Sequence, residues 1–132
     1  MQTNNARAGR PLSPHLSIYH FTITMMMSIV HRITGGALYF GTLILAWWLI
    51  AAASGPQAFA VVSGFLASWF GQLLLFGYSW ALFHHMLGGI RYLIWDSTAL
   101  MEKGQRDKLA WASLIGSLVL TALVWTVVLT LR

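Results

Sequence analysis

The sequence predicts an all-α membrane protein with three transmembrane helices. Its 132 residues are 58% hydrophobic and only 8% charged, whereas a water-soluble domain of this size needs far more charge to cover its surface. The apolar residues gather in three long stretches, and most of the charged residues lie outside them. We therefore expect a single membrane-anchor domain over residues 1–132, with lipid as its solvent.

The first apolar stretch is expected to form a transmembrane helix over about residues 25–53. It ends at Ser54, Gly55 and Pro56, a combination that favours a turn. A hydrocarbon core about 30 Å thick needs roughly 20 helical residues. Because this stretch is longer than that, the polar residues near its N-terminal end are expected close to an interface.

The second and third stretches are expected to cross the membrane over about residues 59–95 and 109–131. The second is longer than one perpendicular crossing, so its first turns should lie at the interface or the helix should tilt strongly. The third carries no charge from Leu109 to Leu131 and is the plainest span of the three. A solvated loop over residues 97–108, with Gly104 as a helix breaker, is expected to join them.

The distribution of charge predicts the orientation. The N-terminal segment 1–24 and the loop 97–108 hold most of the lysine and arginine, whereas residues 54–58 hold none. The positive-inside rule then places the N-terminus and the loop 97–108 in the cytoplasm and Arg132 outside. The N-terminal segment resembles neither a secretory signal nor a long arginine- and serine-rich presequence, which leaves a bacterial chain or a mature one. Of these we expect a bacterial chain of the cell inner membrane. Without cysteine, the chain itself can form no disulfide and ligate no iron–sulfur cluster through thiolates.

Two clusters of polar residues inside the spans are candidates for a functional site, because ionisable side chains are costly in a membrane. The first comprises Ser28, His31 and Arg32, whose offsets of three and four residues place them on one helix face. Together they could donate hydrogen bonds to a carbonyl or a carboxylate. Alternatively, Arg32 extends to the interface and Ser28 bonds back to its own helix. Spacing alone leaves both interpretations open.

The second cluster surrounds His85. At about 100° per residue, small residues that include Gly88 and Gly89 share its helix face. A flat macrocycle ligated by histidine needs such a face, but small residues also serve helix packing. His84 points about 100° away and is a competing ligand, so helix geometry does not choose between the two histidines. Asp96 follows His85 by eleven residues, or roughly 16 Å of helix, which places it near the cytoplasmic boundary.

Three separated segments carry a resemblance to a known family. They are residues 10–19 (RPLSPHLSIY), 28–35 (SIVHRITG) and 85–96 (HMLGGIRYLIWD). In order, spacing and topology they resemble the cytochrome b subunit of succinate dehydrogenase, respiratory complex II. The resemblance implies an anchor that packs with a second membrane subunit into a helical bundle. This bundle would hold the flavoprotein and iron–sulfur subunits at the cytoplasmic face, and electrons from succinate would reduce ubiquinone.

The resemblance also implies roles for individual residues. His85 matches the axial ligand of haem b, with the other ligand supplied by the second anchor subunit, and this decides against His84. Ser28 and Arg32 match the ubiquinone-binding pair, and His31 and Arg32 lie where haem propionates are contacted. The remaining matches are two apolar lining positions and a nearby acidic one: Leu16, Phe21 and Asp96.

One position departs from the family pattern. Many relatives have histidine where this chain has Tyr92, which leaves the role of His85 unchanged and the local propionate or proton contacts open. The chain alone is expected to be inactive toward succinate and to contain no catalytic residue. Two alternatives remain, namely a haem-free structural anchor and a small proton- or ion-conducting protein that uses its intramembrane histidines.

Overall fold

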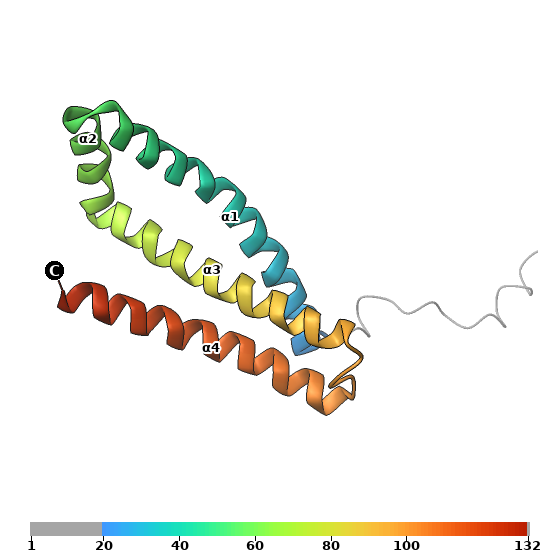
Figure 1. Ribbon diagram of the computed structural model, residues 1–132. Coiled ribbons are helices and arrows are strands. Elements are labelled where there is room, and N and C mark those ends of the chain that lie inside the picture. The colour runs from blue at the N-terminus through green and yellow to red at the C-terminus, as the bar shows by residue number, and fades with distance from the viewer. Residues whose placement is uncertain (1–19, 132) are drawn as a thin grey trace, which may run out of the picture.

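The computed structural model describes residues 20–131. Within this range the elements are α1 (Ile23–Ser54), α2 (Pro56–Ala67), α3 (Trp69–Asp96) and α4 (Lys103–Thr130). Figure 1 shows α3 and α4 side by side, with α1 meeting the C-terminal half of α3 and separating from it toward α2. The expected all-helical architecture with three long apolar helices is confirmed.

The three long helices are able to cross a membrane. Helix α1 has 32 residues, and α3 and α4 have 28 each. At 1.5 Å per residue, 28 residues extend about 42 Å, which exceeds a hydrocarbon core of about 30 Å. Large apolar side chains are exposed along all three helices, as expected for surfaces that face lipid or other apolar subunits. Helix α2, with 12 residues, is too short to cross.

The turn between α1 and α3 is built by special backbone positions. Gly55 has a φ of 118°, a conformation that only glycine adopts without strain, and Pro56 occupies the first turn of α2, where its missing N–H costs nothing. Helix α2 ends at Ala67, and the hydroxyl of the next residue, Ser68, accepts a hydrogen bond from the backbone N–H of Gly71 at 3.1 Å. A Cβ at Gly71 would lie 2.3 Å from the carbonyl oxygen of Phe65, so the tight turn requires glycine there.

The structure therefore divides the second apolar stretch, residues 59–95, into two helices. Ser68 is extended, with φ −63° and ψ 159°, and its side chain caps α3. Hydropathy is continuous across this break, which is why the sequence alone indicates a single long segment.

The loop between α3 and α4 is shorter than expected. Helix α4 begins at Lys103, and Gly104 lies in its first turn instead of ending a helix. The reversal of direction is made by Thr98 and Leu100, whose φ angles are 61° and 55°. Because these residues already supply the left-handed backbone, the turn does not need Gly104.

Small residues, most of them with a hydroxyl group, form the contact surface of α4. Ala110, Ser113, Ser117 and Thr121 recur every three or four residues and are buried. Their hydroxyls are satisfied within the helix: those of Ser113 and Thr121 donate to the carbonyl oxygens of Ala110 and Ser117 at 2.8 Å. Small side chains let two membrane helices approach closely, and this surface packs α4 against α3.

Candidate functional site

The two histidine clusters meet where α1 packs against α3. The rings of His31 and His85 stack in parallel, with centroids 4.0 Å apart and an interplanar angle of 2°. Two glycines make this approach possible. A Cβ at Gly88 would lie 2.3 Å from Nδ1 of His31, and one at Gly35 would lie 2.9 Å from Cε1 of His85. The contact therefore depends on a missing side chain on each helix.

A hydrogen bond sets the tautomer of His85. Nδ1 of His85 lies 3.1 Å from the backbone carbonyl oxygen of His31. A carbonyl oxygen can only accept, so Nδ1 is the donor and carries a proton. The lone pair of the neutral imidazole is then on Nε2, which becomes the ring atom able to bind a metal.

Ser28 also faces α3. Its hydroxyl lies 3.2 Å from the phenol oxygen of Tyr92 and donates to the backbone oxygen of Thr24 at 3.0 Å. The phenol therefore supplies the proton of the interhelical bond, since the single proton of Ser28 is already used. Helical periodicity places Tyr92 on the face of His85, but only the packing of α1 brings it to Ser28.

The other residues of the sequence-predicted site are placed differently. Arg32 is exposed, and within residues 20–131 its side chain makes no hydrogen bond or ion pair. At about 100° per residue it lies about 40° from Ser28 and about 100° from His31, and of these three residues Ser28 and His31 contact α3. Asp96 and Phe21 are also exposed. Leu16 lies outside the described residues.

His84 faces the opposite neighbour. It is fully buried, and its Nδ1 lies 3.4 Å from the hydroxyl of Ser117 on α4. One turn below, its ring stacks on Trp80 with centroids 5.3 Å apart. His84 and His85 thus contact different helices. Helix geometry within α3 could not have indicated which histidine faces α1.

A buried arginine, Arg91, is the largest polar group that the site prediction passed over. Its side chain is 1% exposed, and Nη1 donates to the hydroxyl of Ser113 at 3.2 Å. The guanidinium carbon also lies 5.2 Å from the centre of the Trp95 ring, within the range of a cation–π interaction. Nε and Nη2 are buried without a hydrogen-bond partner among the described residues. The signal in the sequence was an arginine well inside an apolar stretch.

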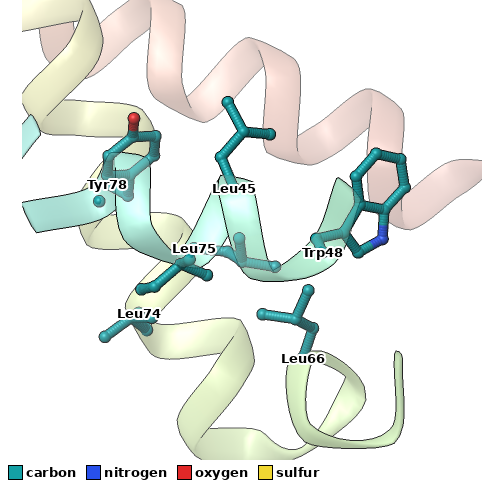
Figure 2. A pocket seen from close by; sticks show the side chains of 8 residues that line it. Leu45, Trp48, Leu66, Leu74, Leu75 and Tyr78 are labelled. Atoms are coloured by element: carbon teal, nitrogen blue, oxygen red, sulfur yellow. The ribbon is translucent and has the colours of Figure 1, made fainter. Parts of the chain in front are cut away.

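Two cavities lie at opposite ends of the α1–α3 contact. One, of about 240 Å³, is walled by apolar residues of α1, α2 and α3. Figure 2 shows these side chains around it, and Tyr78 contributes the single phenol among them. The other, of about 230 Å³, is lined by Thr24, Met25, Ser28, Trp95, Met101 and Arg106. Only the second cavity contains a residue of the sequence-predicted site, namely Ser28.

Fold and site together define a helical membrane protein with several spans and a histidine pair between two of them. Residues 6–124 match the family model described as succinate dehydrogenase/fumarate reductase transmembrane subunit. This match covers most of the chain, so the chain belongs to that family and is a multi-pass membrane protein. The resemblance carried by the three sequence segments is thereby confirmed.

Individual relatives are similar along nearly the whole chain. The succinate dehydrogenase cytochrome b556 subunit of Paracoccus denitrificans is 43% identical over 117 residues, which cover 89% of this chain and 90% of the relative. That of Rickettsia felis is 37% identical over 88% of this chain and 90% of its own length. The mitochondrial cytochrome b560 subunit of Bos taurus is 36% identical over 92% of this chain and 70% of its own length.

Proposed function

We propose that this chain is the haem b- and ubiquinone-binding anchor of a succinate:ubiquinone oxidoreductase. The observation that carries the proposal is the meeting of Ser28 and His31 on α1 with His85 and Tyr92 on α3. This contact gathers a metal-binding imidazole and several hydrogen-bonding groups between two membrane helices. The relatives are named as cytochrome b subunits of the same enzyme.

The chemistry of His85 fits an axial ligand to haem. Its protonated Nδ1 is held by a backbone carbonyl, which leaves Nε2 to bind iron and fixes the orientation of the ring. A Cβ at Gly89, one turn beyond, would meet nothing within 4 Å, so the surface beside His85 is open enough for a flat ring. No three histidine or acidic side chains of residues 20–131 form a metal site, and the second axial ligand is assigned to the partner anchor subunit.

The bound haem would supply a one-electron redox centre within the membrane. His85 would bind its iron, and His31, whose Nδ1 is buried without a partner among the described residues, would contact a propionate. The exposed guanidinium of Arg32, on the same helix as His31, can donate hydrogen bonds to a propionate or to the quinone. Asp96 remains a neighbouring acidic group.

Ubiquinone reduction requires hydrogen-bond donors at the carbonyl oxygens, where negative charge develops. Ser28 lies in the cavity of about 230 Å³ at the end of the bundle, and Tyr92 supports its hydroxyl. Electrons would arrive from an iron–sulfur subunit and originate in a flavoprotein subunit. Ser28 binds and orients the quinone head, and this chain performs no step on succinate. Leu16 and Phe21 are proposed as apolar lining from the N-terminal segment.

The charges at this end of the bundle support a cytoplasmic orientation. Lys103, Arg106 and Lys108 lie at the beginning of α4, beside the end of α3 and on the side where α1 begins (Figure 1). By the positive-inside rule this end faces the cytoplasm of a bacterium and the C-terminus of α4 faces the periplasm. The soluble subunits would then dock next to the cavity that holds Ser28.

Absorption spectra of the purified complex test the haem assignment. We expect His85→Ala to abolish the reduced haem b band, because it removes the nitrogen ligand, and His84→Ala to retain it, because His84 faces α4. Both variants should still co-purify with the other subunits. A band that survives in His85→Ala, or that is lost only in His84→Ala, would contradict the assignment. A complex without any haem band would support the structural anchor instead.

A further inference from the structure

The cavity beside Ser28 is built by three helices. Thr24, Met25 and Ser28 come from the start of α1, Trp95 from the end of α3, and Met101 and Arg106 from the loop and the first turn of α4. The two methionines and the indole give it apolar walls, while the serine and the arginine bring polar groups from different helices. Arg32 does not line this cavity, although the sequence pairs it with Ser28.

The arginine of this cavity is available to a ligand. Arg106 is exposed and held in α4 by a bond from its backbone N–H to the carbonyl oxygen of Glu102 at 2.9 Å. Within residues 20–131 its guanidinium makes no ion pair or hydrogen bond, even though Glu102 and Asp107 are close in sequence. The indole Nε1 of Trp95, another wall residue, is also without a hydrogen-bond partner among the described residues.

These groups match the shape of a quinone head. A benzoquinone is a flat apolar ring with carbonyl oxygens at its two opposite ends, so a binding site needs apolar walls and a donor at each end. Ser28 can supply one donor from α1 when its hydroxyl rotates away from the backbone oxygen of Thr24, to which it donates in the free chain. A guanidinium on the facing helix can supply the other, and its hydrogen bond to an oxygen strengthens as electrons add negative charge to the ring.

We propose that Arg106 binds the quinone carbonyl opposite the one bound by Ser28, and that Trp95 forms the wall against which the ring packs. The inference rests on the proposed quinone-binding function and adds a specific residue to it. Arg106 acts by binding and orienting the substrate, and it transfers no proton. The cationic start of α4 thus contributes to the quinone site as well as to the orientation of the chain.

The test uses the complete four-subunit complex in native membranes. Arg106→Gln is compared with Lys108→Gln, which removes the same charge two residues away from a side chain that does not line the cavity. The KM for a short-tailed ubiquinone is measured along with succinate oxidation by an artificial dye acceptor, which reports assembly. Loss of one charge-assisted hydrogen bond is expected to raise the KM of Arg106→Gln about tenfold, with the dye activity unchanged. Arg106→Lys should recover part of the affinity, and Lys108→Gln should behave as the parent.

Ser28→Ala separates the failure of this inference from the failure of the proposed function. If Ser28→Ala raises the KM and Arg106→Gln does not, the quinone site stands and the role of Arg106 is refuted. If neither variant alters the KM while both complexes assemble, the proposed quinone function fails as well. An equal effect of Lys108→Gln would mean that general charge, not a contact in the cavity, governs binding. Parallel loss of dye activity in Arg106→Gln would assign the residue to subunit docking and overturn the inference.

Discussion

The close approach of His31 to α3 predicts the effect of adding one methyl group at Gly88. A Cβ there would lie 2.3 Å from Nδ1 of His31, whereas non-bonded heavy atoms prefer about 3.5 Å or more. The imidazole would therefore have to move by about 1 Å, within a contact that also includes the stacked ring of His85. Overpacking of this kind costs about 1–3 kcal/mol, so Gly88→Ala should destabilise the complex.

Gly64→Ala provides the matched control. Gly64 lies within α2, and a Cβ there would meet nothing within 4 Å. Both substitutions gain about 1 kcal/mol of helix propensity, so the difference between them isolates the clash. The measurement is the thermal stability of the detergent-solubilised complex, followed by loss of dye-reductase activity and of the visible spectrum. Gly88→Ala should be the less stable of the two by about 1–3 kcal/mol.

A double substitution distinguishes a clash with His31 from any other effect at Gly88. If His31 is the obstacle, Gly88→Ala should cost little in a His31→Ala background, and the two changes should be strongly non-additive. Additive losses would mean that the methyl group meets something else. Equal stability of Gly88→Ala and Gly64→Ala would refute the packing of α1 on α3 described above.

Two further predictions concern interhelical hydrogen bonds. Tyr92→Phe removes the bond to Ser28 and should lower the stability of the complex by about 0.5–1.5 kcal/mol while the haem band remains. Thermal scans and spectra of the same sample measure both effects. A lost band would instead show that Tyr92 contributes to haem binding. Ser113→Ala removes the described hydrogen-bond partner of the buried Arg91 and should cost about 1–3 kcal/mol in the same thermal assay. Unchanged stability there would mean that another group satisfies the guanidinium.

The features that were predictable depend on local composition. Long apolar stretches specify three long membrane helices because every backbone group must be satisfied within the membrane, and the helices agree with that expectation. The break at Ser68 was not predictable from hydropathy, because a serine costs little inside an apolar stretch. Its effect comes from the cap that it forms with Gly71 and from the tight turn that accommodates α2.

The candidate site was predictable in its components more than in its contacts. Spacing placed Ser28, His31 and Arg32 on one broad helix face, but it did not indicate that the first two contact α3 while Arg32 stays exposed. Arg106 was counted among the solvated loop charges. It joins the cavity because α4 starts earlier than its hydropathy indicates and brings its first turn next to α1.

The sequence by itself determined that this chain lies in a membrane, that it has three long helices, and which family it belongs to. Hydropathy and the order of motifs are properties of the sequence, and they do not depend on how the helices pack. Tertiary structure alone decided that His85 faces α1 while His84 faces α4, and which cations border the cavity of Ser28. Adjacent residues on a helix point about 100° apart, so the role of each depends on which neighbouring helix lies in its direction. That arrangement arises from glycines and small hydroxyl residues distant in sequence, whose missing bulk lets the helices meet.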